Sequence, residues 1–163
     1  MTLSLNVLLW SFLMAFSIHI VEESTVGDGF VQMMKKNFWP EYDGMKFFWF
    51  NLILFSLFAI GIVLFEIFQR AWVIWPLGFA FMCVTNGIWH LLQTAILREY
   101  SPGLITSPIY WILMYFIVRS NLLTGEISPS HFWTAMVIGM LMTLLMFGSV
   151  WSFRLRTRRG TGS

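Results

Sequence analysis

The stretch FFWFNLILFSLFAIGIVLFEI, residues 47–67, decides the fold class of this chain. Its length matches the roughly 20 apolar residues that an α-helix needs to cross a bilayer, and Glu66 is the one charged residue within it. The chain contains four more runs of this kind, at 3–20, 71–97, 105–118 and 132–153. The sequence therefore predicts an all-α fold, a polytopic membrane helix bundle with about five transmembrane helices, in a single domain over residues 1–163.

The composition also favours a membrane location. Charged residues make up 11% of the chain, against about 25% in an average soluble protein, and 58% of the residues are hydrophobic. Nine Trp and seventeen Phe residues suit a chain that meets lipid and the membrane interfaces, where aromatic side chains collect. We therefore expect an integral membrane protein with membrane lipids as partners. No nucleic-acid partner is expected, because the sequence has no motif of that kind.

The run at 105–118 is the weakest of the five, because it is shorter than a full crossing requires. It either spans the membrane, with length borrowed from the preceding Ser101-Pro102-Gly103 turn, or re-enters on the side from which it came. Both interpretations remain open at this point.

The basic residues predict the orientation, because cytoplasmic loops carry an excess of Lys and Arg. Five spans with a cytoplasmic carboxyl terminus place most of the basic residues inside, including a tail at 154–163, and leave only Arg70 and Arg119 outside. The loop after the first run lies on the inner side in this topology. Its segment 30–38 mixes apolar residues with two lysines and predicts an amphipathic helix at the membrane surface.

The first run ends in a polar motif that is unusual at membrane depth. His19, Glu22 and Glu23 fall at i, i+3 and i+4, so on a continued helix one imidazole and two carboxylates share a face. Charged groups at that depth are costly unless they are paired or used.

A second polar group lies in the third run. Asn86, His90 and Gln93 follow one another at i, i+4 and i+7, which forms one stripe on a helix. In the predicted orientation this stripe lies at a depth similar to that of the first motif, and Asn51 of the second run enters the same leaflet. The polar side chains therefore converge on the inner side of the membrane.

These motifs resemble those of the HXXEE family of small bacterial integral membrane proteins. The resemblance rests on three elements in order, namely His19, Glu22 and Glu23, then Asn86 and His90, then Arg98, Tyr100, Ser101, Pro102 and Gly103. It implies a location in the bacterial cytoplasmic membrane and a polar site within the membrane. It implies no established reaction.

The polar side chains suggest two kinds of chemistry. Two imidazoles and two carboxylates form a nitrogen and oxygen ligand set that suits one divalent ion, zinc, iron or manganese, and these ligands are His19, Glu22, Glu23 and His90. Without a metal, the same four residues would act as an acid/base pair of imidazole and carboxylate. The groups expected to orient them or to contact a substrate are Asn51, Asn86, Gln93, Arg98 and Tyr100.

Three functions are compatible with this site. The first is a membrane-embedded enzyme, metal-dependent or acid/base, whose lipid-like or other hydrophobic substrate enters from the inner leaflet. The second is a small transporter or carrier of ions or protons. The third is a structural protein in which the polar side chains only hold helices together, with Glu22 and Glu23 facing interfacial water or pairing with Lys35, Lys36 or Arg98. The sequence predicts no oligomeric state.

Overall fold

The computed structural model describes residues 3–160 of the chain. Within this range the side chains of Arg70, Phe147 and residues 149–160 are not described, so the predicted outer Arg70 and the predicted basic tail at 154–163 lie outside the described residues. The described chain contains six α-helices, a 3-10 turn η1 at Gln69–Trp72 and a π-helical turn η2 at Val118–Leu122. The α-helices are α1 Leu5–Thr25, α2 Gly29–Asn37, α3 Gly44–Phe68, α4 Ile74–Leu97, α5 Ser107–Ile117 and α6 Pro129–Gly160.

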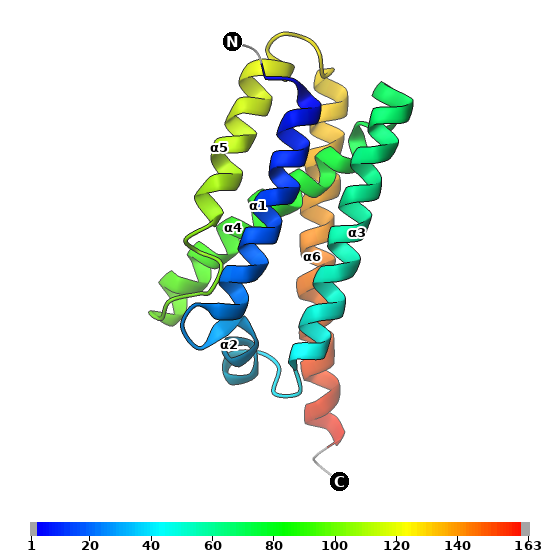
Figure 1. Cartoon of the computed structure of the whole chain (residues 1–163). Helices are drawn as coiled ribbons and strands as arrows, with labels where there is room; N and C mark the ends of the chain where they lie inside the picture. The colour runs from blue at the N-terminus through cyan, green and yellow to red at the C-terminus, as the bar shows by residue number, and fades with distance from the viewer. Residues whose placement is uncertain (1–2, 161–163) are drawn as a thin grey trace.

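The predicted helical membrane bundle is confirmed. Among the described residues, four helices are long and apolar enough to cross a bilayer. These are α1, α3, α4 and the part of α6 at Pro129–Met146. The two ends of the chain lie at opposite ends of the bundle (Figure 1). Which end faces the cytoplasm stays a prediction.

Local signals set the ends of these helices. Ser4 caps α1, because its hydroxyl accepts a hydrogen bond from the backbone N–H of Val7. Asp43 caps α3 in the same way, through the backbone N–H of Lys46 at 2.8 Å. α4 ends where Arg98 adopts a left-handed conformation with φ of 55°. The chain turns back sharply after this residue.

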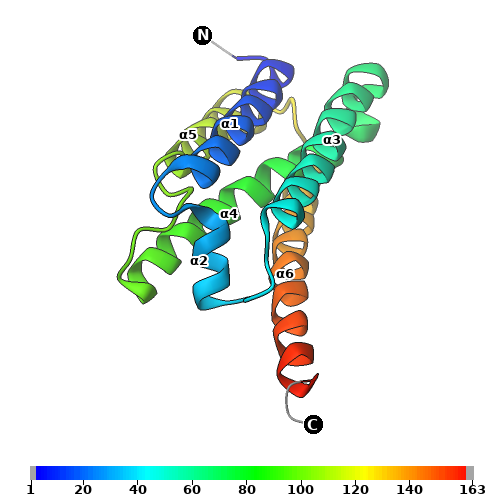
Figure 2. The same cartoon turned by 60° about the horizontal axis from the view of Figure 1, so that its bottom comes forward.

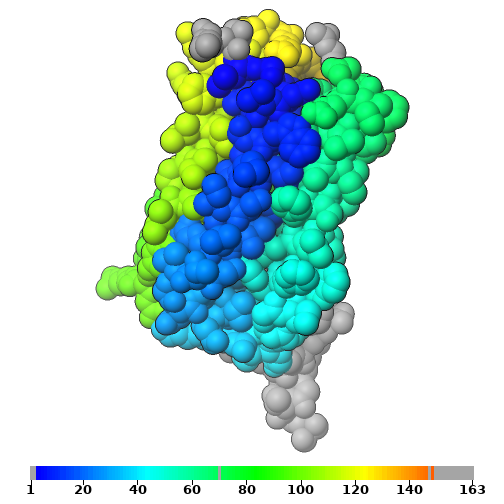
Figure 3. Space-filling model, viewed as in Figure 1, coloured from blue at the N-terminus to red at the C-terminus, as the bar shows by residue number. Residues whose placement is uncertain are grey.

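Small residues let the helices approach closely. α4 crosses the bundle obliquely and packs against α6 (Figure 2). A Cβ atom added to Gly139 of α6 would lie 2.5 Å from the carbonyl oxygen of Gly78 of α4. In α3, Gly61 leaves room for the indole of Trp75, whose Nε1 donates to the carbonyl oxygen of Leu57 at 3.1 Å. α1 lies between α5 and α3 and covers one face of the molecule (Figure 3).

The fourth expected segment, 105–118, differs from a full-length span. α5 has 11 residues, which at 1.5 Å per residue covers about half of a hydrocarbon core roughly 30 Å thick. The helix is preceded by a non-helical stretch, 98–106, in which Ser101, Pro102 and Gly103 are buried. Irregular backbone is tolerated within a membrane only where protein or water satisfies its polar groups. The partner that satisfies this stretch belongs to the candidate site.

The predicted amphipathic segment at 30–38 forms α2. Its buried side chains, Met33 and Met34, pack with Tyr42 and Phe47 in a small apolar cluster separate from the main core. On its other side, Lys36 forms an ion pair with Glu99 at 2.7 Å. α2 therefore lies across one end of the bundle and is tied to the stretch 98–106.

Candidate functional site

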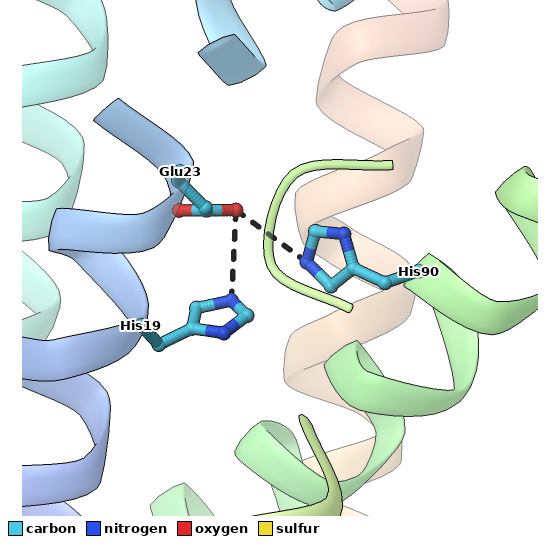
Figure 4. Close-up of side chains that lie close together, drawn as sticks. All are labelled: His19, Glu23 and His90. Carbon is cyan, nitrogen blue, oxygen red and sulfur yellow. Dashed lines mark ion pairs between the residues drawn. The ribbon is translucent and has the colours of Figure 1, made fainter. Parts of the chain in front are cut away.

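Three buried side chains from two helices meet inside the bundle. His19 and Glu23 lie one turn apart on α1, and His90 lies on α4 (Figure 4). One oxygen of Glu23 is 3.6 Å from Nε2 of His19 and 3.4 Å from Nε2 of His90. Both imidazoles are 0% exposed and Glu23 is 6% exposed. The three ligand atoms lie within 4.8 Å of one another, a spacing that fits a single metal ion. We call these three residues the His/Glu cluster.

The hydrogen bonds of His19 determine which of its nitrogens carries the proton. Nδ1 lies 2.8 Å from the hydroxyl oxygen of Thr106. That hydroxyl donates its one hydrogen to a carboxylate oxygen of Glu22 at 2.6 Å. Thr106 can therefore only accept from His19, so Nδ1 carries a proton, and in the neutral imidazole Nε2 presents a lone pair to the His/Glu cluster.

His90 is held in the same tautomer by a different pair of residues. Its Nδ1 lies 2.9 Å from the hydroxyl oxygen of Ser101. The Ser101 hydroxyl donates to the side-chain oxygen of Gln93 at 2.8 Å, and it therefore accepts from Nδ1 of His90. In the neutral imidazole, the Nε2 atom of His90 then presents a lone pair that also faces the cluster.

Asn86 agrees with both assignments. Its amide nitrogen lies 3.1 Å from Nε2 of His19 and 3.1 Å from Nε2 of His90, and an amide group has two hydrogens to donate. One oxygen of Glu23 therefore faces the lone pairs of two nitrogens in a buried space, Nε2 of His90 at 3.4 Å and Nε2 of His19 at 3.6 Å. Asn86 satisfies the two nitrogens, and a cation or a proton between the three acceptors would also satisfy the oxygen of Glu23.

The carboxylate of Glu22 binds the stretch 98–106 rather than the three cluster residues. Its carboxylate accepts hydrogen bonds from the backbone N–H groups of Gly103, Ile105 and Thr106 at 2.8–2.9 Å and from the hydroxyls of Thr106 and Tyr100. A carboxylate has about four lone-pair positions, so these donors occupy it fully. Glu22 therefore lies outside the group of ligand atoms and satisfies the irregular backbone before α5.

Tyr100 reaches this carboxylate from the surface. Its hydroxyl donates to Glu22, and its side chain is partly exposed. Burial and the hydrogen bond to Glu22 raise the pKa of Tyr100 well above its ordinary value. The phenol is thus held protonated, as a donor, over the whole physiological range.

Gly103 lies against both imidazoles. A Cβ atom at this position would be 2.6 Å from Cε1 of His19 and 2.7 Å from Cε1 of His90. Its φ of +106° is also a conformation that L-residues rarely adopt. The stretch 98–106 therefore approaches the cluster closely enough to fix both rings, and only glycine fits at its centre.

A cavity of about 500 Å³ adjoins the His/Glu cluster. His19 and Glu23 line it together with Asn51, Asn86 and Gln93, so the polar lining includes three of the residues expected from the sequence to contact a substrate. The rest of its wall is mostly aromatic and aliphatic, and includes Phe16, Phe30, Met34, Phe38, Trp39, Phe50, Ile53, Leu54, Met82, Trp89 and Tyr110.

Two expected contacts of the charged residues are not present. Arg98 is exposed at the end of α4, and within residues 3–160 it forms no ion pair with Glu22 or Glu23. Lys36 pairs with Glu99 instead of the motif glutamates. Neither do these glutamates face interfacial water, because each is only 6% exposed. Asn51 lies at the cavity wall and its amide donates to the carbonyl oxygen of Phe47 at 3.0 Å.

Sequence reasoning missed two residues of the site. Thr106 orients His19, and the Thr106-Ser107-Pro108 sequence at the start of a helix was a usable signal, because Thr and Pro favour these positions. Tyr110 lines the cavity beside His19, but it lies in an apolar run and carries no signal that separates it from a core residue. Ser101 and Gly103 were found only as members of a motif.

Comparison with known proteins gives one match. The sequence model of a family described as "Protein of unknown function with HXXEE motif" matches residues 10–118, which include the His/Glu cluster, Glu22 and the whole stretch 98–106. No curated protein and no solved structure matches the chain.

Proposed function

The chain belongs to the HXXEE family, and from the cluster that this motif builds with His90 we propose that the protein is a metal-dependent enzyme embedded in the membrane, which acts on an apolar, lipid-like substrate. The family description names neither a substrate nor a reaction, so we infer the substrate class and the kind of chemistry from the site itself. The distribution of basic residues and the family resemblance favour the bacterial cytoplasmic membrane as its location.

One observation carries the proposal. Nε2 of His19, Nε2 of His90 and an oxygen of Glu23 are three acceptors that face one another in a buried space. A divalent ion would use all three, and it would replace the hydrogen bonds that Asn86 now donates to both nitrogens. Two imidazoles and one carboxylate are the ligands of many catalytic zinc sites, which keep a further position for water or substrate.

The neighbouring residues match a metal site as well. Metal-binding histidines usually donate their second ring N–H to an oxygen, which fixes the ring and the tautomer. Here Thr106 and Ser101 provide those oxygens, and Glu22 and Gln93 orient the two hydroxyls in turn. Nitrogen and oxygen ligands without a thiolate suit zinc, iron or manganese. Such an ion would polarise a substrate oxygen or activate a water molecule.

The cavity supports an apolar substrate. Its volume of about 500 Å³ is in the range of sites for small organic ligands, and most of its wall is hydrocarbon. Phe50 and Ile53 line it and are also exposed on the outer surface of α3, at 39% and 55%. This favours entry sideways from the bilayer. Lys46, which also lines the cavity, favours an entrance near the membrane interface.

The carrier hypothesis has less support. A path for ions or protons would need polar groups along the bundle beyond the cluster. On α1, the residues that precede His19 and face the core are apolar, among them Leu8, Leu9, Phe12 and Phe16. On α1, the polar face therefore ends at the cluster, which favours a binding site over a continuous path.

The metal content of the protein tests the proposal. Detergent-purified protein is loaded with zinc, iron(II) or manganese, desalted and analysed by mass spectrometry, together with His90→Ala and Glu23→Gln. We expect about one metal ion per chain in the wild type and loss of most of it in both variants. His131→Ala and Glu126→Gln are the matched controls, because these residues lie outside the cluster, and they should bind metal normally.

Folding is checked by size exclusion and circular dichroism. A folded wild type that retains none of the three metals would contradict the metal-dependent enzyme and leave acid/base chemistry. Equal metal content in the wild type and in a folded His90→Ala protein would show that the ion binds elsewhere.

A further inference from the structure

Tyr110 has a buried hydroxyl that the fold does not use. The residue lies on α5, is 0% exposed and lines the cavity. Its ring lies 5.4 Å from the ring of His19 and stacks on Phe12 at 6.0 Å with an interplanar angle of 2°. Within the described part of the chain, its hydroxyl has no hydrogen-bond partner.

An unpartnered buried hydroxyl calls for an explanation. Buried polar groups are almost always hydrogen-bonded, because leaving one without a partner costs free energy. Phenylalanine would stack on Phe12 equally well, so the packing gives no reason for the hydroxyl. Among the described residues, no acceptor lies within hydrogen-bond distance of this hydroxyl, including the carboxylates of Glu22 and Glu23. The partner of Tyr110 therefore comes from within the cavity.

The distribution of polar groups suggests the shape of that partner. His19, Glu23, Asn86 and Gln93 line the cavity together with Tyr110, whereas most of the remaining wall is aromatic or aliphatic. A ligand that fits this arrangement has an oxygen at one end and a hydrocarbon chain in the remaining space. Since Tyr110 is a donor beside a cation-binding cluster, the oxygen must be an acceptor, such as that of a carbonyl group.

We infer that the cavity binds an apolar chain bearing one hydrogen-bond-accepting oxygen, and that the hydroxyl of Tyr110 donates to this oxygen next to His19. This inference rests on the proposed function and specifies its substrate class as a chain with a carbonyl or ester group. Tyr110 is then a substrate-binding residue. A donor on one side of the oxygen and the metal on the other would both stabilise negative charge on it.

A binding experiment with two probes tests the inference. The probes are a brominated long-chain methyl ester and a bromoalkane of the same length, so that they differ in the ester group. Bromine quenches tryptophan fluorescence on contact, and Trp39 and Trp89 line the cavity. The proteins are the wild type, Tyr110→Phe and, as a matched control on the same helix, Tyr115→Phe, whose side chain is 61% exposed on the outside of the bundle.

The expected result is specific for the ester. The wild type and Tyr115→Phe should bind the ester more tightly than the alkane. Tyr110→Phe should lose about threefold to tenfold in ester affinity, the effect of one neutral hydrogen bond, with unchanged alkane affinity. Equal ester affinity in the wild type and Tyr110→Phe would overturn the inference, and so would a wild type that binds ester and alkane alike.

The same samples separate this inference from the proposed function. Tyr110→Phe should contain as much metal as the wild type, because Tyr110 is not a member of the His/Glu cluster. A wild type that binds no metal but distinguishes the ester from the alkane through Tyr110 would refute the metal-dependent enzyme alone. A metal-loaded wild type that does not distinguish the probes would refute the role of Tyr110 alone.

Discussion

Replacing Gly103 with alanine should disturb the His/Glu cluster directly. The new Cβ atom would lie 2.6 Å from Cε1 of His19 and 2.7 Å from Cε1 and Nε2 of His90. These distances are shorter than any real carbon contact, so at least one imidazole must move. Both rings are 0% exposed, and each is hydrogen-bonded through both of its nitrogens, so neither can move without breaking these bonds.

The size of the effect has two sources. Overpacking of a buried site costs about 1–3 kcal/mol. The φ of +106° adds strain of about 1–3 kcal/mol for a residue with a Cβ atom. We therefore expect Gly103→Ala to lower the free energy of unfolding by about 2–6 kcal/mol.

Gly125 offers a matched control. Its φ is also positive, at +79°, but among the described residues no atom lies within 4 Å of an added Cβ. Gly125→Ala should show the backbone strain alone, about 1–3 kcal/mol. The difference between the two variants then measures the clash with the imidazoles.

The assay combines stability and metal content. Unfolding in mixed detergent micelles with increasing dodecyl sulfate, followed by tryptophan fluorescence, gives the free energy of unfolding of each variant. Mass spectrometry of the folded fraction gives its metal content, which should fall in Gly103→Ala and stay at the wild-type level in Gly125→Ala. Wild-type stability and metal content in Gly103→Ala would refute the close approach of this glycine to both histidines.

Three further substitutions test other parts of the structure. Thr106→Val removes the acceptor of the His19 ring proton and should weaken zinc binding about 10–100-fold in a chelator competition; unchanged affinity would contradict the tautomer derived for His19. Glu22→Gln should lower the free energy of unfolding by about 1.5–3 kcal/mol, because neutralising the carboxylate weakens its charge-assisted hydrogen bonds to 98–106; a loss below about 0.5 kcal/mol would contradict this role. Gly139→Ala should lower the free energy of unfolding by about 1–3 kcal/mol, because its Cβ would overlap α4. Gly148→Ala is the control and should be neutral or slightly stabilising, because no described atom lies within 4 Å of its added Cβ. Equal effects of the two substitutions would contradict the close contact of α4 and α6.

The fold was largely predictable because the lipid bilayer permits few backbone structures other than helices. The apolar side chains of a run such as 47–67 favour lipid over water, and in lipid the backbone must satisfy its own hydrogen bonds as a helix does. The apolar length of the run alone therefore indicates a membrane helix. The segment 105–118 was not predictable in this way. Its irregular start is satisfied by Glu22, which lies more than 80 positions earlier in the chain, as the hydrogen bond to Ile105 shows. A contact of that kind is not visible in local composition.

The site was predictable in its residue types and less so in their roles. Helical spacing placed His19, Glu22 and Glu23 on one face, and depth in the membrane placed His90 opposite them. Spacing does not fix the direction of a long side chain, and so Glu22 was expected among the ligands although its carboxylate turns to the stretch 98–106. Tyr110 was missed because only the cavity distinguishes it from a core residue.

The alternative pairing of Arg98 with the motif glutamates is absent for a backbone reason. Its charge and its place after the third run suggested a partner for the glutamates. In the structure it is the left-handed residue that ends α4, with φ of 55°, and its side chain is exposed. The donors that satisfy Glu22 are instead backbone N–H groups and the hydroxyls of Tyr100 and Thr106, none of which carries a charge.

X-ray absorption spectroscopy at the zinc edge of the purified, zinc-loaded protein tests the central claim most directly. Ligation by His19, His90 and Glu23 predicts nitrogen and oxygen neighbours at about 2.0–2.2 Å, with the outer-shell scattering of two imidazole rings. His90→Ala should lose one of the two imidazole contributions or the zinc itself. A spectrum without imidazole scattering, or one with a sulfur ligand at about 2.3 Å, would contradict a metal site built from these three residues.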